Sequence, residues 1–285
     1  MTTQPAELLP PEVDERVAAI EASFERHWRH FGGYPGARLR DEDGVLWFES
    51  PIRHLPYNWV IRTRIPDDRD PEAVIERVAA GFRARDVPFM WVHRPSDRPA
   101  DLDRHLAGHG LDLVETALGM DLELDGWRAE PNRSHAVLVQ ADAPGADEQG
   151  LADYEELIRT YWSVPEEERH LIRTLNRHWT GERSPGVRLV AYLDGQPVGK
   201  CFVNLEDLPS WVAIFGVAVK PEARGHGVAT ALMNEAIARG QKQGARRAVL
   251  QSSSMAVSMY RRMGFVERCR FPVFATDALF GTHHH

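Results

Sequence analysis

The sequence predicts an α/β protein made of two related halves. Strand-like and helix-like hydrophobic runs alternate along the chain, and the stretch Asp125–Ser134 between the halves has linker chemistry without periodicity. The segments "HLAGHGLDLVE" and "YRRMGFVERCR" both run helix, glycine, large apolar residue, strand. A chain of 285 residues has room for two domains of about 100–200 residues each, so one unit used twice fits its length.

The first half is expected to hold three helices and four strands. Pro71 suits the first turn of the second helix, because a proline there loses no intrahelical hydrogen bond. The expected order is helix 11–31, strands 45–49 and 59–65, helix 71–85, strand 88–92, helix 101–108 and strand 113–124.

The second half is expected to follow the order β-α-α-β-β-β-α-β-α-β. The turn "DGQ" that begins at Asp194 is a strong hairpin signal between two of these strands. The expected elements are strand 135–140, helices 147–161 and 165–179, strands 187–193, 197–205 and 211–219, helix 227–243, strand 246–251, helix 254–263 and a strand from Phe265.

The composition is that of an ordinary globular protein and excludes several partners. A net charge of −8 argues against nucleic acid and mildly favours a cationic small molecule, although a solvated acidic face explains it equally well. No apolar run approaches the roughly 18 residues that cross a bilayer, so no membrane partner is expected. The N-terminus lacks the basic start and apolar core of a signal peptide, so a cytoplasmic location is expected. The large excess of arginine over lysine suggests codon bias in a GC-rich bacterium.

Cys201 and Cys269 are expected to be reduced thiols in the core, since both lie in strand-like contexts. The final residues 281–285, "GTHHH", look like the remnant of a purification tag and carry no argument for a metal site. No metal is expected.

The stretch "VAVKPEARGHGVATALM", Val217–Met233, predicts a site for pyrophosphate. Pro221 ends a buried strand, and two glycines one residue apart let the next loop turn its N–H groups to one side. A helix begins directly afterwards, and its first N–H groups have no partner within the helix. Arg224 adds a bidentate charged contact for phosphate.

Three phosphate-binding motifs compete for this loop. The Walker loop requires a lysine that is missing here, and "GHGVAT" has Thr230 in place of the last glycine of the dinucleotide fingerprint. The third motif fits at every position: "RGHGVA", Arg224–Ala229, resembles the Arg/Gln-x-x-Gly-x-Gly/Ala loop of the GNAT acetyltransferases. "SSSMAVSMYRRMGF", Ser252–Phe265, resembles the next signature of that family, and the order of elements also matches over residues 134–275.

The resemblance implies two tandem GNAT-like domains, each with a mixed, mostly antiparallel sheet flanked by helices. Residues 134–275 would form the active domain and residues 1–130 a degenerate copy that is structural or contacts the acceptor. The implied co-substrate is acetyl-CoA. The implied coenzyme-binding positions are Val217, Ala218, Val219, Arg224, Gly225, His226, Gly227, Val228, Ala229, Thr230 and Ser253, with the imidazole of His226 expected at the loop surface.

The first half lacks both parts of the site. Its corresponding loop, "IPDDRDPEAV", places Asp67, Asp68 and Asp70 where the glycines should be, and carboxylates repel a pyrophosphate. Leu106 takes the place that corresponds to Tyr260. Tandem members with one active and one degenerate half are known in the family, and this chain has the same organisation.

The resemblance also implies direct attack of an amine on the thioester. Tyr260 would be the general acid that protonates the coenzyme A thiolate, while Tyr161 and Trp162 would line the acceptor pocket. We name no general base, since Glu206 and Asp207 are expected at the wrong end of their strand.

Each of these residues also has a purely structural interpretation. Tyr260 suits a core aromatic packed with Met255 and Met263, Arg224 a solvated loop arginine, and the two glycines simple turn chemistry. Packing between two helices is an equally good interpretation of Tyr161 and Trp162.

The leading functional hypothesis is an acetyl-CoA-dependent N-acetyltransferase for the amine of a small molecule, and the acidic net charge favours a cationic one. A protein N-terminus or lysine as acceptor is the alternative within the same fold, and a non-catalytic coenzyme A-binding module is the alternative in another class. We expect either a monomer with pseudo-dimeric halves or a homodimer.

Overall fold

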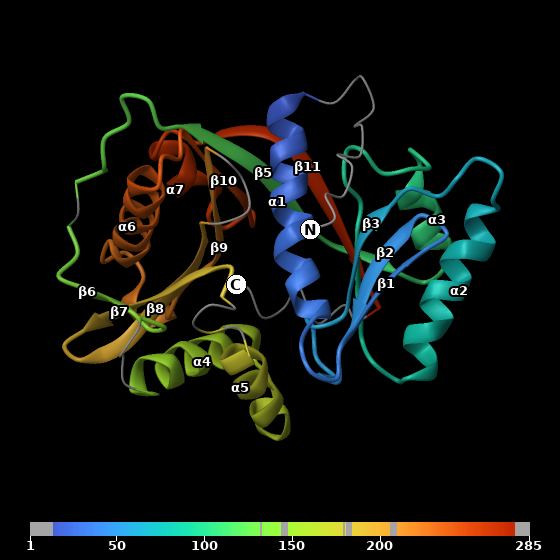
Figure 1. Ribbon diagram of the computed structural model, residues 1–285, viewed down its shortest axis with the longest axis horizontal. Helices are drawn as coiled ribbons and strands as arrows, with labels where there is room; N and C mark the ends of the chain where they lie inside the picture. Colours follow the sequence, from blue (N-terminus) through green and yellow to red (C-terminus); the bar gives the residue numbers. More distant parts are fainter. Residues whose placement is uncertain are drawn as a thin grey trace, which may run out of the picture.

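The structure is a computed structural model, and it describes residues 14–131, 133–143, 148–178, 180, 184–205 and 210–276. Within these residues, eleven strands form one sheet in the order β1-β2-β3-β4-β11-β5-β10-β9-β8-β7-β6. The predicted α/β class is confirmed, with a mixed sheet flanked by helices (Figure 1). None of the described helices is long and apolar enough to cross a membrane. Residues 281–285, the expected tag remnant, lie outside the described residues.

The first half follows the predicted order with one addition. The additional strand, β1, has the sequence Arg-Leu-Arg-Asp-Glu and is mostly exposed, so it lacks the hydrophobic pattern that identifies a buried strand. A short charged strand is a common way to end a sheet without inviting further pairing. The elements are α1 (Glu15–Gly32), β1 (Arg38–Glu42), β2 (Val45–Glu49), β3 (Trp59–Thr63), α2 (Pro71–Ala84), β4 (Met90–Val92), α3 (Leu102–Gly108) and β5 (Asp112–Glu123).

The second half has every predicted element. The helix expected from Ser254 begins only at Val257, because residues 254–256 form a turn. The elements are β6 (Val137–Gln140), α4 (Glu148–Trp162), α5 (Arg169–His178), β7 (Gly186–Leu193), β8 (Gln196–Asn204), β9 (Trp211–Val219), α6 (Val228–Lys242), β10 (Arg247–Ser252), α7 (Val257–Arg262) and β11 (Val266–Ala275), with short 3-10 turns η1 (Glu166–Glu168) and η3 (Pro221–Ala223).

The two halves exchange their last strands. β5 of the first half lies between β10 and β11 of the second half and is antiparallel to both. β11 in turn lies between β5 and β4, so each half places one strand inside the other half's part of the sheet. The exchange also mixes the cores: Met120, Leu122 and Leu124 from β5 and its end pack in the same cluster as α6, α7 and the strands of the second half.

Helix α1 lies between the halves and packs on strands of both (Figure 1). Its Ile20 and Phe24 belong to a core cluster that includes Phe202 and Phe215 of the second half. A first-half helix therefore covers part of the second half's sheet, which matters for the site described below.

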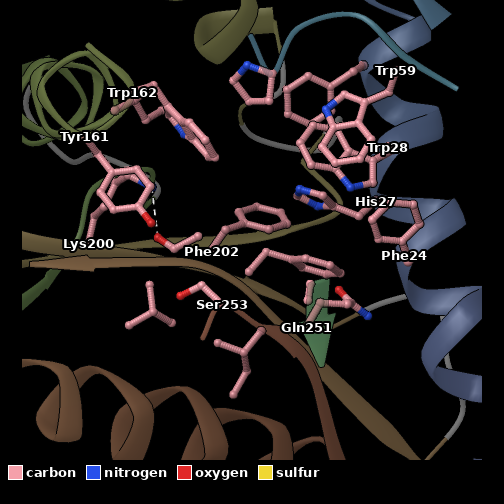
Figure 2. Close-up of a pocket in the computed structure, with 18 of the residues that line it drawn as sticks. Phe24, His27, Trp28, Trp59, Tyr161, Trp162, Lys200, Phe202, Gln251 and Ser253 are labelled. Carbon is pink, nitrogen blue, oxygen red and sulfur yellow. Dashed lines mark hydrogen bonds between the residues drawn. The ribbon is translucent and has the colours of Figure 1, made fainter. Parts of the chain in front are cut away.

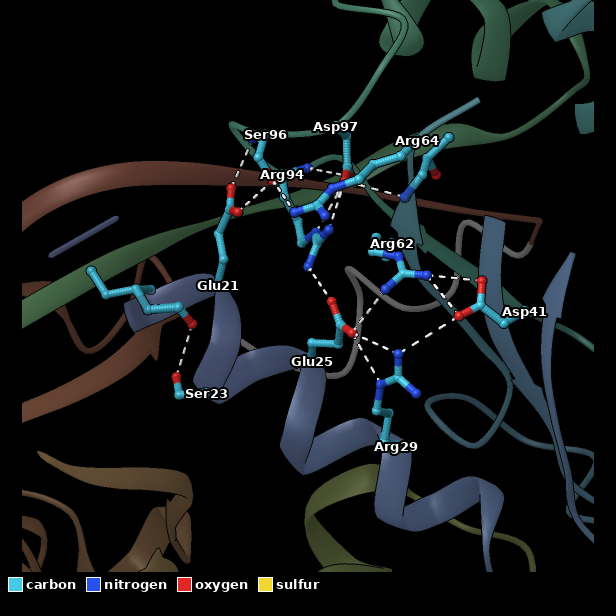
Figure 3. Close-up of polar contacts among 12 residues, drawn as sticks. Glu21, Ser23, Glu25, Arg29, Asp41, Arg62, Arg64, Arg94, Ser96 and Asp97 are labelled. Atoms are coloured by element: carbon cyan, nitrogen blue, oxygen red, sulfur yellow. Dashed lines mark hydrogen bonds and ion pairs between the residues drawn. The ribbon is translucent and has the colours of Figure 1, made fainter. Parts of the chain in front are cut away.

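Buried ion pairs hold α1 in this place (Figure 3). Glu25 of α1 accepts from Arg94 at 3.0 Å and from Arg62 at 3.2 Å, and Arg94 also pairs with the buried Asp97 at 3.0 Å. Burial alone would raise the pKa of Glu25, but Arg94, Arg62 and Arg29 outweigh it and hold that pKa below its usual value. Breaking a buried pair leaves an uncompensated charge, so the network strongly resists displacement of the helix.

Candidate active site

The glycine loop after β9 has the geometry of an anion site. Gly225 and Gly227 have φ of 79° and 74°, a left-handed conformation that favours glycine, and Gly227 is the N-cap of α6. Within the described part of the chain, the backbone N–H groups of residues 225–230 donate to no partner. Unpaired amides at a helix N-terminus are suited to phosphate oxygens, which the sequence predicted for this loop.

Arg224 lies on the exposed side of the same loop. Its Nε donates to the carbonyl of Val219 at 3.4 Å, which folds the side chain back over the end of β9. Its positive charge also acts on the phenol of Tyr161, where it opposes the rise in pKa that burial causes. Arg224 therefore lies between the glycine loop and the α4 side of the site. His226 is exposed, as expected.

Strand β9 is interrupted beside β8 where the thioester is expected. Lys200 pairs with Ala218 and Phe202 with Phe215, so two residues of β9 oppose the single Cys201. Gly216, one of the two, has φ of 57°. Such bulges occur often next to active sites, where they redirect backbone groups. The segment Val217–Val219, predicted to hold the acyl group, begins at this bulge.

Lys200 makes a hydrogen bond to the backbone of the bulge, and it was not among the predicted site residues. Its Nζ donates to the carbonyl of Gly216 at 2.9 Å, and burial lowers its pKa to about 8. The signal that could have identified it is a lysine inside an apolar strand, in a chain with very few lysines.

A cavity of about 270 Å³ opens beside the bulge and lies between the two halves. Of the predicted site residues, Val217, Ser253, Tyr161, Trp162 and Tyr260 line it together, and Figure 2 shows Tyr161, Trp162 and Ser253 around the open space. The structure thus brings the end of β9, the second signature segment and both acceptor-pocket residues to one cavity, while their roles stay predictions. The predicted coenzyme-binding positions Ala218, Val219 and 224–230 are not part of its lining. The side of the cavity opposite Tyr161 and Ser253 is formed by α1 of the first half, and none of its residues was predicted.

Tyr260 contacts both the core and the cavity. Its ring packs edge-on against Phe265 at 5.7 Å and shares a cluster with Met263, whereas Met255 is exposed and does not share that core. Burial raises the pKa of Tyr260 well above its usual value, so the phenol keeps its proton at neutral pH. A protonated phenol beside the thioester site is suited to act as an acid.

One carboxylate lines this cavity among the described residues, and it belongs to the first half. Glu115 lies on β5, the exchanged strand. Burial raises the pKa of Glu115, and the nearby backbone N–H of Ser254 only partly opposes the rise. Glu206 and Asp207, the two second-half carboxylates expected at the wrong end of their strand, lie outside the described residues.

The corresponding loop of the first half differs in the way the sequence predicted. Asp70 is the N-cap of α2, and its side chain accepts from the backbone N–H of Glu72 at 3.1 Å. A carboxylate therefore already occupies the helix N-terminus, and Asp67 and Asp68 next to it are exposed. Leu106, at the position of the tyrosine, is fully buried among apolar side chains.

Comparison with known proteins agrees with this geometry. Residues 151–265 match the model of the Acetyltransferase (GNAT) family. A mycothiol acetyltransferase of Cellulomonas flavigena is 25% identical over 317 aligned positions, which cover 96% of this chain and 86% of the relative.

Solved structures share the fold over almost the whole chain. A GCN5-related N-acetyltransferase from Kribbella flavida has a TM-score of 0.62 at 14% identity, covering 91% of this chain and 95% of that one. A tandem GNAT protein from the clavulanic acid biosynthesis pathway has a TM-score of 0.56 at 14% identity, covering 95% and 97%. The boundary between domains 1–130 and 134–275 stays a prediction. Residues 151–265 therefore match the GNAT family of acetyltransferases, and the whole chain has the fold of tandem GNAT proteins.

Proposed function

We propose that the protein transfers an acetyl group from acetyl-CoA to the primary amine of a small molecule. The observation that carries this proposal is that the β9 bulge, Ser253 and Tyr260 border one cavity, and that the glycine loop follows the end of the same strand β9. The residues fit the coenzyme: unpaired amides of residues 225–230 and Arg224 suit its pyrophosphate, and Ser253 with Val217 to Val219 suits the pantetheine arm.

In this reaction the amine nitrogen attacks the thioester carbonyl and forms a tetrahedral intermediate. Backbone groups at the β9 bulge stabilise the developing oxyanion, an effect typically worth about 10²–10³ in rate per donor. The intermediate collapses to the amide and expels the coenzyme A thiolate, which accepts the proton of Tyr260.

The size of the cavity favours a small acceptor over a protein. A volume of 270 Å³ lies near the lower limit of small-molecule sites, about 300–1,000 Å³, and it is walled by α1, α4 and the sheet. A peptide substrate needs a groove that lets the chain pass on both sides of the reacting amine. A purely coenzyme-binding module has no need for a phenol at the cavity wall.

The direct test is release of free thiol from acetyl-CoA against a panel of amines. Small amines should be acetylated faster than a lysine-containing peptide of equal amine concentration. If acetyl-CoA binds but the peptide is the better acceptor, the protein-acetyltransferase alternative replaces this proposal. If acetyl-CoA binds and no amine or peptide releases thiol, the non-catalytic alternative replaces it.

Arg224→Glu should weaken acetyl-CoA binding by about 10- to 100-fold, because a charged contact worth about 1.5–3 kcal/mol is replaced by a repelling carboxylate. Isothermal titration calorimetry measures the change, and higher salt should narrow the gap because Arg224 is exposed. Arg104→Glu makes the same charge change on α3 of the first half and serves as the control. An unchanged dissociation constant for Arg224→Glu would place the phosphates elsewhere.

One acetyl-CoA should bind per chain. The second half has the glycine loop and Tyr260, whereas the first half has Asp70 at the helix N-terminus and the buried Leu106. Calorimetric stoichiometry checks this, and two equivalent sites per chain would contradict it.

A further inference from the structure

The wall of the cavity that faces away from the coenzyme loop is aromatic. Trp28 and Trp59 lie with their ring centroids 4.8 Å apart, and Phe24 meets Trp59 edge-on at 5.7 Å (Figure 2). Protein interiors rarely leave voids much larger than a water molecule, so an open space of 270 Å³ among such rings indicates a binding site. Aromatic walls favour an aromatic ligand, because rings pack edge-to-face or offset against each other.

The charged residues around this cavity favour a ligand cation beside one of them, Glu115. Arg188 is paired with Asp142 at 2.9 Å, and Lys200 donates to the carbonyl of Gly216. His27 is stacked on Phe215 at 3.8 Å, and burial lowers its pKa to about 3, so it is neutral at pH 7. Glu115 remains, and within the described part of the chain no cation pairs with it. An ammonium group that enters an apolar cavity needs such a counter-charge.

Glu115 also lies close to the reacting groups. Its charge contributes to the raised pKa of Tyr161, and Tyr161 in turn contributes to the raised pKa of Tyr260. The backbone N–H of Ser254, next to the cavity residue Ser253, lies near the Glu115 carboxylate. An amine held by Glu115 is therefore on the same side of the cavity as the predicted acid.

Trp59 offers a ligand its ring carbons and not its indole N–H. The indole nitrogen is buried with almost no accessible surface, although other atoms of Trp59 line the cavity. Figure 2 shows Trp59 on the α1 side, well away from Tyr161 and Ser253. The far end of the acceptor therefore meets aromatic carbon.

We propose that the acceptor is a primary amine on an aromatic body, with the ammonium at Glu115 and the ring among Phe24, Trp28 and Trp59. Glu115 is then the general base, supplied to the active half by the degenerate half. This inference rests on the function proposed above and specifies its acceptor.

The proton balance is complete with these residues. Glu115 takes one proton from the ammonium, and the neutral amine forms a C–N bond to the thioester carbon. The C–S bond breaks, the thiolate takes the Tyr260 proton, and the second nitrogen proton restores the phenol. Glu115 releases its proton to solvent, so the net products are the amide, coenzyme A thiol and one proton.

Tyramine and 2-phenylethylamine are the first probes, because each carries a primary amine on one aromatic ring. The kcat/KM of both should exceed that of glucosamine and of spermidine, which have no aromatic ring to pack against Phe24, Trp28 and Trp59.

Glu115→Gln should lower kcat/KM for tyramine by about 10²–10⁴-fold, the usual range for losing a general base, and leave the dissociation constant of acetyl-CoA unchanged. Asp112→Asn removes a carboxylate from the exposed side of the same strand and should behave like wild type. If Glu115→Gln keeps wild-type turnover, Glu115 is not the base.

The pH profile gives an independent readout. A base must be deprotonated, so wild-type kcat/KM should fall as the pH drops through the Glu115 pKa, which burial raises above its usual value. The kcat/KM of Glu115→Gln should not show this fall at low pH. Other titratable groups also line the cavity, and their effects on the pH profile must be separated from that of Glu115: His27, His30, Tyr57, Tyr154, Tyr161, Arg188, Lys200 and Tyr260.

The two proposals fail differently. If wild-type protein does not bind acetyl-CoA, the proposed function is wrong. If it binds acetyl-CoA but acetylates glucosamine or spermidine with the higher kcat/KM, only the aromatic acceptor is wrong. If no amine is acetylated, calorimetric titration of tyramine into the coenzyme A complex decides, and no binding overturns the inference.

Discussion

Residues 134–282 expressed alone are expected to aggregate or to lack activity. Without β5, strand β10 loses one neighbour, and β11 loses both of its neighbours because β4 is also missing. Met120, Leu122 and Leu124 leave the core of the second half as well. Losing a buried side chain of this size costs about 2–5 kcal/mol, so three cost about as much as the entire stability of a typical domain, 5–15 kcal/mol. Unpaired strand edges then favour aggregation.

Soluble yield, circular dichroism and thiol release measure this result. A longer fragment that begins at residue 110 keeps β5 and should recover part of the soluble yield, which separates the loss of the strand from the loss of the rest of the first half. Coexpression of residues 1–133 with residues 134–285 should restore more, because β4 and α1 return. A soluble and fully active 134–282 fragment would show that the first half is an independent module.

Tyr260→Phe is expected to lower kcat by about 10²-fold with little change in acetyl-CoA affinity. The ring contact with Phe265 survives this substitution, and the hydroxyl donates to no partner among the described residues, so no buried group loses a hydrogen bond. A fall in kcat at constant coenzyme affinity marks an interaction that is made mainly in the transition state. The loss is smaller if the thiolate departs readily without an acid.

Tyr192→Phe removes a hydroxyl that donates to Asp153 at 2.7 Å, outside the cavity lining, and is the matched control. It should keep the wild-type kcat. Steady-state kinetics with tyramine or another accepted amine, together with calorimetry for acetyl-CoA, separates the two effects. If Tyr260→Phe is folded and keeps full turnover, Tyr260 is a packing residue and another group protonates the thiolate.

Local sequence patterns predicted the conformation of the glycine loop, while its role in binding the coenzyme stays a prediction. The backbone at Gly225 and Gly227 is left-handed, a conformation that favours glycine. Two glycines between a strand and a helix therefore left few interpretations of this loop. The order of elements followed from hydrophobic periodicity, since most strands and helices are long enough to show it. β1 was missed because its charged, exposed residues carry no such pattern.

The acceptor side was not predictable by the same reasoning. Periodicity shows that a strand such as β5 is buried on its faces, but it contains no information about which strands are its neighbours. Glu115 is 145 positions before Tyr260 in the sequence, and only the strand exchange brings it to the same cavity. No sequence pattern assigned Trp28 or Trp59 to the cavity, because their distance from the second half depends on how α1 and β3 pack in the shared sheet.

The exchange of β5 and β11 has a consequence for symmetry. In a dimer of two identical subunits arranged in this way, the strand that completes a neighbour's sheet also carries the same side chains into the neighbour's site, so both sites must change together. A single chain that holds both copies removes this restriction. Its two central strands differ in sequence, so the side chains that each strand brings into the other half can change independently.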